Sequence, residues 1–158
     1  MSALQNKIDF VALVSVTMAN SNGDPLNGNR PRTNYDSRGE ISDVCIKRKI
    51  RNRLQDMGQC IFVQSDDRCD DGCASLRDRA EQAIKGVKDR NEYARLACEK
   101  WIDVRSFGQV FAFKEKKKGD GVSVGVRGPV SIHQALSVSP VEIESLQITK
   151  SVNGETPS

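Results

Sequence analysis

The apolar residues of this chain fall into segments with different spacing. Residues 8–18 are mostly β-branched and apolar, which predicts a buried strand. Residues 42–57 carry apolar side chains every three to four positions, which predicts an amphipathic helix. Ser42 is suited to cap the start of this helix, and Gly58 is suited to end it. The apolar stripe of the helix consists of Ile46, Ile50, Leu54 and Met57.

The rest of the chain alternates between helix and strand signals. Residues 60–64 predict a short strand, a second helix starts near Ser75, and helical spacing resumes over residues 93–101. The last third contains strand candidates at residues 104–113, 122–126, 129–132 and 138–149, followed by an unstructured tail at residues 151–158. The pattern predicts an α+β protein, and a length of 158 residues is that of one ordinary domain, residues 1–158.

A long loop at residues 20–38 separates the first predicted strand from the first predicted helix. It is rich in Asn, Gly and Pro and contains Arg30 and Arg32. Glycine lets backbone N–H groups approach an anion, and arginine side chains form paired hydrogen bonds with phosphate oxygens. A flexible connector would have a similar composition, so the loop alone leaves phosphate binding and a connector role both open.

Positive charge is concentrated in one part of the chain. The net charge is only +3, but residues 38–53 contain six Lys and Arg residues against two acids. Lys47, Arg48 and Arg51 are neighbours on the predicted helix and lie outside its apolar stripe. They suit either a phosphate-binding face or an ordinary solvated helix face.

Three phenylalanines alternate along the predicted strand at residues 104–113. Phe107, Phe111 and Phe113 would share one face of that strand, where they would stack on nucleic-acid bases or fill the core of a sheet. Aromatic residues make up only 5% of the chain, which favours the core because a small domain needs them inside.

The chemistry-bearing residues indicate neither catalysis nor metal binding. Five cysteines without a secretory signal favour reduced thiols, and the single histidine, His133, lies far from them in sequence. Asp24 and Asp36 could bind a cation, although acids in such turns usually serve the turn itself. No motif of a hydrolase, a nucleotide-binding loop or a zinc protease is present, and no apolar run is long enough to span a bilayer. We therefore expect a cytoplasmic protein that is no enzyme and has no cofactor, metal or membrane partner.

Four stretches together are similar to a known family. They are NSNGDPLNGNRPRTNYDSRGEISDVCIKRKIRNRL, KWIDVRSFGQVFAF, VGVRGPVSIHQALSVSPVEI and QITKSVNGE. Their combination resembles the N-terminal half of the guide-RNA-binding backbone subunit of the type I-C CRISPR Cascade complex. The likeness runs from the first predicted strand to the end of the chain, and it is long enough to be specific.

The resemblance implies both a fold and an antiviral role. The fold would be an RRM-like, ferredoxin-type palm with inserted loops, apparently truncated because subunits of this family are longer than this chain. The function would be non-catalytic: copies of the subunit polymerise along CRISPR RNA, contact other Cascade subunits, and display the guide for pairing with target DNA. The RNA-binding residues implied by position are Asn22, Gly23, Arg30, Arg32, Lys47, Arg48, Arg51 and Arg127.

Two other functions stay open. A shortened copy of the backbone subunit could act as a decoy or cap that inhibits Cascade. Related subunits of type III complexes cut RNA with an aspartate in the loop after the first strand, and Asp24 lies in a comparable loop here. Type I backbone subunits lack that activity, so the resemblance favours a binding protein.

Overall fold

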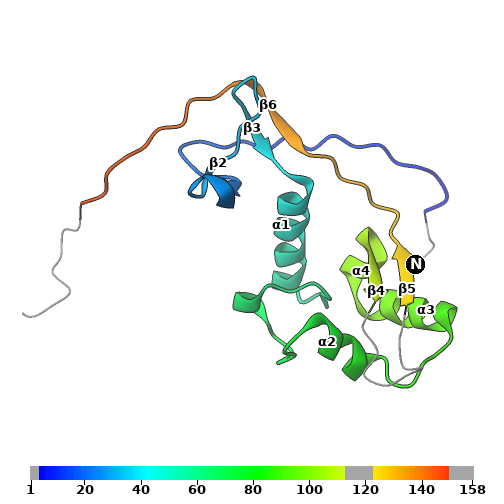
Figure 1. The fold of residues 1–158 in the computed structure, drawn as a ribbon. Helices are drawn as coiled ribbons and strands as arrows, with labels where there is room; N and C mark the ends of the chain where they lie inside the picture. The colour runs from blue at the N-terminus through cyan, green and yellow to red at the C-terminus, as the bar shows by residue number, and fades with distance from the viewer. Residues whose placement is uncertain (1–3, 113–122, 150–158) are drawn as a thin grey trace, which may run out of the picture. The chain divides into compact units, whose positions relative to one another are not determined.

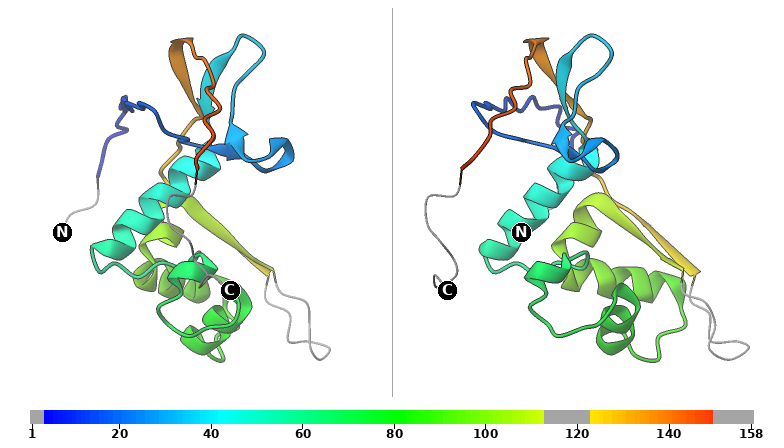
Figure 2. Two further views of the ribbon diagram at one scale, coloured as in Figure 1. Left: turned by 90° about the vertical axis from the view of Figure 1, so that its left-hand side faces the viewer. Right: turned by 60° about the vertical axis from the view of Figure 1, so that its left-hand side comes forward.

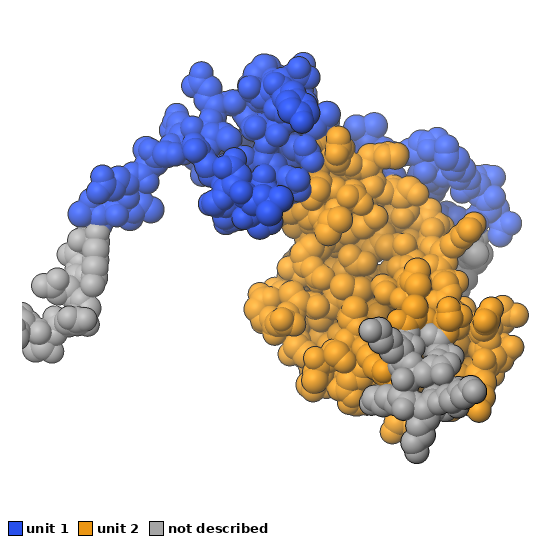
Figure 3. Space-filling model, in the orientation of Figure 1, with its two compact units in different colours: residues 1–40, 136–158 blue, residues 41–135 orange. Residues whose placement is uncertain are grey.

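The computed structural model describes residues 4–112 and 123–149 (Figure 1). Its contacts divide the chain into two compact units, which Figure 3 distinguishes by colour. Unit 1 comprises residues 1–40 and 136–158, and unit 2 comprises residues 41–135. The predicted tail at residues 151–158 lies outside the described residues. The mixture of helices and small antiparallel sheets confirms the predicted α+β class.

The first two helices of unit 2 begin at the caps that the sequence predicts. Helix α1 (Asp43–Asp56) follows Ser42, whose side chain accepts a hydrogen bond from the Cys45 N–H at 3.2 Å. A short 3₁₀ turn, η2 (Asp66–Arg68), precedes helix α2 (Leu76–Ala83). The predicted helices at these two places are confirmed.

Two further helices and a hairpin complete the described part of unit 2. Helix α3 (Arg90–Lys100) is followed almost at once by α4 (Ile102–Phe107). Strand β4 (Gly108–Ala112) pairs antiparallel with β5 (Ser123–Arg127), in a register that places Gly108 opposite Arg127. This hairpin lies beside α3 and α4 (Figures 1 and 2).

The predicted strand at residues 104–113 is wrong in its first half. The chain stays helical to Phe107 and becomes a strand only at Gly108. Gly108 has φ +78° and ψ 167°, a conformation that is accessible essentially to glycine alone and that turns the chain out of the helix. The change of direction at this glycine is therefore what separates α4 from β4.

An aromatic core holds unit 2 together. The rings of Phe62 and Phe111 are fully buried with their centroids 5.0 Å apart, and Trp101 lies 4.7 Å from Phe62. Tyr93 meets Phe111 edge-on at 5.3 Å. The core interpretation is thus confirmed for Phe111.

The other two phenylalanines do not share a face with it. Phe107 ends helix α4 and is half-buried, so it belongs to a different element from Phe111. Phe113 lies outside the described residues. The predicted three-residue aromatic face is therefore wrong for Phe107.

Two of the shorter predicted strands are absent. Residues 60–64 form no strand, because the N–H groups of Phe62 and Val63 donate to the carboxylate of Asp103 instead of to a neighbouring strand. Residues 129–132 also form no strand; the Val130 N–H donates to the Ser106 carbonyl oxygen at 2.9 Å. In both places, hydrogen bonds to residues far away in sequence take the place of pairing with a neighbouring strand.

The strands described in unit 1 are short. Strand β1 (Gly23–Asp24) leads into the 3₁₀ turn η1 (Pro25–Asn27) and pairs antiparallel with β2 (Arg30–Pro31). Strand β3 (Arg38–Ile41) pairs with β6 (Ala135–Pro140). The loop predicted between the first strand and the first helix is thus largely organised into turns and strand pairs.

The predicted buried strand at residues 8–18 is wrong. No described strand pairs with this segment, and its apolar side chains are exposed, for example Leu13 at 92%. The predicted strand at residues 138–149 survives only as β6, and Ile148 is 93% exposed. Extended apolar segments form strands only where a second strand satisfies their backbone N–H and C=O groups.

Helix α1 is also attached differently from the prediction. None of its residues is buried, and Met57 at the end of the apolar stripe is 62% exposed. Polar side chains of α1 make hydrogen bonds with the rest of unit 2, among them Arg48, Arg51 and Gln55. The apolar stripe does not join the buried core cluster of unit 2.

Candidate nucleic-acid interface

The glycine-rich segment of unit 1 is ordered by its own hydrogen bonds. The Asn29 N–H donates to the Asp24 carbonyl at 2.8 Å, and the Arg32 N–H donates to the Asn22 carbonyl at 3.0 Å. At Gly23, a Cβ atom would run into the side chain of Asn29, so glycine permits this close crossing. The predicted contacts Asn22, Gly23, Arg30 and Arg32 therefore lie together on the β1–β2 turn.

Two of these residues have guanidinium groups that form few contacts with other described residues. Arg30 is exposed, and its Nη2 lies 3.4 Å from the Ser145 hydroxyl. Arg32 is half-buried, and its side chain has no hydrogen-bond or ion-pair partner among residues 4–112 and 123–149. Asn22 donates through Nδ2 to the Gly23 carbonyl at 3.1 Å. Both arginines can accept a phosphate without breaking an internal ion pair.

Asp24 has a structural task in the same turn. Its carboxylate Oδ1 accepts a hydrogen bond from the Leu26 N–H at 3.1 Å and so caps η1. This is the turn-supporting role that such acids usually have.

The three predicted cations of α1 all have partners inside unit 2. Lys47 Nζ lies 3.2 Å from the Asp43 carboxylate, and Arg48 Nη1 donates to the Val63 carbonyl at 2.7 Å. Arg51 Nε lies 3.0 Å from the carboxylate of Asp103, and the Arg51 side chain is only 13% exposed. Its guanidinium also stacks over the Phe107 ring at 5.2 Å from the centroid.

Asp103 is the centre of this arrangement. Its side chain is fully buried and accepts hydrogen bonds from Phe62 N–H at 2.7 Å, Val63 N–H at 3.1 Å and Arg51. Burial and the nearby positive charge of Arg51 lower the pKa of Arg48. Arg48 and Arg51 therefore help to hold α1 on unit 2, a role that the sequence did not reveal.

Other cations of unit 2 face outward. Lys49 and Arg53 are exposed one helical turn apart on α1, and neither side chain has a polar partner in the described part of the chain. Arg127 ends β5 and is exposed in the same way. Lys49 and Arg53 belong to the basic segment at residues 38–53, but the sequence alone does not show which side of α1 packs inward.

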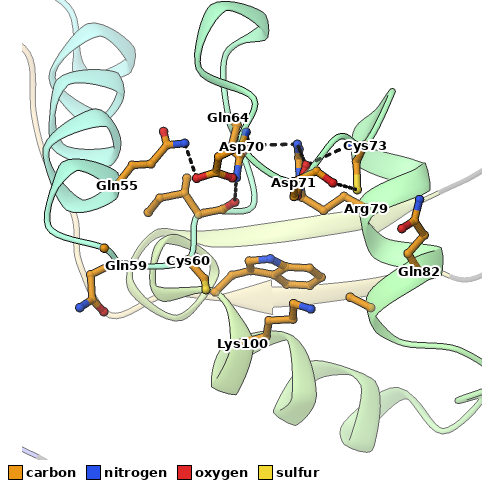
Figure 4. A pocket seen from close by; sticks show the side chains of 14 residues that line it. Gln55, Gln59, Cys60, Gln64, Asp70, Asp71, Cys73, Arg79, Gln82 and Lys100 are labelled. Atoms are coloured by element: carbon orange, nitrogen blue, oxygen red, sulfur yellow. Dashed lines mark hydrogen bonds and ion pairs between the residues drawn. The ribbon is translucent and has the colours of Figure 1, made fainter.

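Unit 2 also contains a cavity of about 420 Å³ beside Trp101, shown in Figure 4. Arg79 on its wall is 5% exposed and donates to the Asp71 carboxylate and, at 2.9 Å, to the Phe62 carbonyl. Hydrogen bonds from Arg79 hold the pKa of Asp71 well below its ordinary value of 3.8. The ion pair joins the turn before α2 to the aromatic core.

This ion pair predicts an acid-sensitive contribution to stability. Because the pKa of Asp71 is lower in the folded state, the contribution is complete above about pH 4 and declines as pH falls further. We expect Asp71→Asn to lower the free energy of unfolding at pH 7 and the difference from the parent to shrink towards pH 3. Urea denaturation at both pH values measures this difference. A difference that stays constant with pH would contradict the prediction.

Two other kinds of site are absent from the described residues. Among the described residues, no group of three or more His, Cys, Asp and Glu side chains is arranged to hold a metal ion. No helix in the described ranges is both long enough and apolar enough to cross a membrane.

Comparison with known proteins places the chain in a family. The family model described as CRISPR-associated protein Cas7 matches residues 6–158. A protein of Haloferax volcanii, named CRISPR-associated protein Cas7, is 26% identical over 155 residues. That alignment covers 87% of this chain and 44% of the relative, so the chain spans less than half the length of this curated relative.

Proposed function

The chain belongs to the CRISPR-associated protein Cas7 family, and from this premise we propose that it is a guide-RNA-binding backbone subunit, or part of one, in a Cascade-type complex. The observation that carries the proposal is the family match over residues 6–158, which includes both basic regions. The proposed partners are CRISPR RNA, further copies of the subunit, other Cascade subunits and, through the guide, target DNA.

The proposed RNA contacts are sequence-independent and electrostatic. Arg30 and Arg32 in unit 1 and Arg127 in unit 2 have guanidinium groups that form no ion pair with another described residue. Each would neutralise a backbone phosphate and release counterions, leaving the bases free to pair. Lys47 can contribute as well, because its partly exposed ion pair with Asp43 costs little to exchange for a phosphate.

A salt series of RNA binding tests this proposal. Fluorescence polarisation of a labelled single-stranded CRISPR RNA should show affinity that falls steeply as salt rises. The double variant Arg30→Gln/Arg32→Gln should bind more weakly, and its salt slope should fall by about 1.4, since each lost contact to single-stranded nucleic acid removes about 0.7. Both changes keep the apolar stems of the side chains.

Lys85→Gln/Lys88→Gln is the matched control. It removes the same net charge from two exposed lysines in the segment after α2. The control should leave the salt slope unchanged, whereas equal losses in both variants would mean that net charge alone attracts the RNA. Charge-reversing Arg48 and Arg51 is unsuitable as a test, because both hold unit 2 together.

The finer assignment is also part of the proposal. We propose the type I-C subtype on the basis of the four sequence stretches quoted above. We also propose a non-catalytic role, which is supported by Asp24, because its carboxylate caps a turn. We propose that the complete subunit forms an RRM-like palm. Its sheet would include residues 8–18, whose apolar side chains are exposed here.

A second candidate function is an interaction protein that caps or blocks the Cascade backbone. The exposed apolar segment at residues 8–18 favours it, because an unpaired extended segment can add to the sheet edge of another chain. The RNA-binding experiment separates the two candidates. Absent RNA binding at low salt, together with association with purified Cascade subunits, would support the cap.

A further inference from the structure

Two cysteines close a short turn in unit 2. Cys69 and Cys73 are four positions apart, and Gly72 between them has φ +69°. Cys69 Sγ lies 3.5 Å from the Cys73 carbonyl oxygen and 3.5 Å from Asp71 Oδ1, which also accepts a hydrogen bond from the Cys73 N–H at 3.1 Å. The turn therefore folds the Cys69 sulfur back over the backbone of Cys73.

The core of unit 2 holds this turn in place. Arg79 donates to both carboxylate oxygens of Asp71 while it also donates to the Phe62 carbonyl. Gln64 adds a contact, since its Nε2 lies 2.7 Å from the carboxylate of Asp70. Because these anchors fix residues 69–73, the two cysteines are held near each other rather than brought together by chance.

The two thiols have different surroundings. Cys69 is exposed, and its Sγ lies 3.5 Å both from Arg79 Nη2 and from Asp71 Oδ1. Cys73 is half-buried; burial and then the Asp71 carboxylate raise the pKa of its thiol. Cys69 is therefore suited to attack first and Cys73 to react second. Of the other three cysteines, Cys45 lies within α1 and Cys98 within α3. Cys60 is exposed and lines the same cavity as Cys73, so it is the rival partner that the test must exclude.

We propose that Cys69 and Cys73 form a redox-sensitive dithiol, which low-molecular-weight disulfides such as oxidised glutathione convert into an intrachain disulfide. The Cys69 thiolate attacks one sulfur of oxidised glutathione, forming a mixed disulfide and expelling a glutathione thiolate. Cys73 then loses its proton to solvent and attacks Cys69 Sγ, which expels the second glutathione thiolate. Both leaving thiolates take up protons, so two protein thiols are oxidised and one glutathione disulfide is reduced to two thiols.

The sequence makes the product easy to identify. Trypsin cuts after Arg68 and Arg77 and leaves both cysteines in one peptide, residues 69–77. The full chain is incubated with oxidised glutathione, quenched with acid, alkylated and digested. Mass spectrometry should find this peptide without alkylation and with the mass of two hydrogens missing. Cys45 and Cys98 should remain alkylated.

Three serine variants sharpen the test. In Cys73→Ser, the reaction should stop at the mixed disulfide on Cys69; in Cys69→Ser, glutathione addition to residue 73 should be about tenfold slower or more. Cys60→Ser should form the product as the parent does. The proposal is overturned if the parent chain accumulates the mixed disulfide on Cys69 without closing it, or if Cys60 is the partner instead. The parent's peptide map decides this even if a variant folds poorly.

Discussion

Replacing Asp103 with alanine is expected to cost about 3–5 kcal/mol of unfolding free energy, the range found when one partner of a buried ion pair is removed. The loss would leave the guanidinium of Arg51 without its counter-ion at 13% side-chain exposure. It would also remove the acceptor for the N–H groups of Phe62 and Val63. Since an unsatisfied buried N–H adds its own penalty, unit 2 should be largely unfolded at 37 °C.

Urea denaturation measures this loss, and the fluorescence of Trp101 reports it because this residue is the single tryptophan and is buried. Glu99→Ala is the control, because the Arg95–Glu99 pair is exposed on both sides and should contribute about 0.5 kcal/mol or less. A loss below about 1 kcal/mol in Asp103→Ala would contradict the central role of this carboxylate.

The helices could be predicted from sequence because their signals are local. Ser42 and Ser75 each lie at the start of a helix, where the hydroxyl accepts a hydrogen bond from the N–H three residues later. These contacts depend only on neighbouring residues, so the local sequence is enough to predict them. The same reasoning explains why Gly58, with φ +76°, marks the end of the helical segment at α1.

The strands were predicted less well because a strand depends on a distant partner. Residues 8–18 have strong strand propensity, yet no described strand satisfies their backbone groups. Residues 60–64 also have the composition of a strand, but Asp103, some forty positions later, takes up two of their N–H groups. Neither outcome can be read from the local sequence.

The prediction of the candidate site was also limited, because it depends on contacts with distant residues. Helical spacing shows correctly that Lys47, Arg48 and Arg51 lie outside the apolar stripe, but it assumes that the stripe faces the core. In unit 2, two basic side chains of α1 also face inward: Arg48 donates to the Val63 carbonyl, and Arg51 pairs with the buried carboxylate of Asp103. Tertiary packing therefore decides which cations face solvent. Only the structure shows that Lys49 and Arg53 are the exposed ones on α1.

Gly128→Ala should be the second strongly destabilising change. A Cβ atom at this position would lie closer than 3.0 Å to the Ser106 carbonyl oxygen, the Phe107 carbonyl carbon and the Gly108 N. All three are backbone atoms, so no side chain can move aside to make room. We expect a loss of about 3 kcal/mol, at the upper end of overpacking effects.

Gly108→Ala should be at least as harmful, because a Cβ there would lie 2.5 Å from the Val126 carbonyl oxygen and the backbone has φ +78°. Gly125→Ala is the control within the same hairpin, since no atom lies within 4 Å of its Cβ position. It should change stability by less than about 0.5 kcal/mol. If Gly128→Ala behaves like this control in urea denaturation, the close crossing of α4 and the end of β5 is wrong. If it unfolds as expected, this crossing fixes the direction of the chain beside Arg127, the proposed phosphate contact of unit 2.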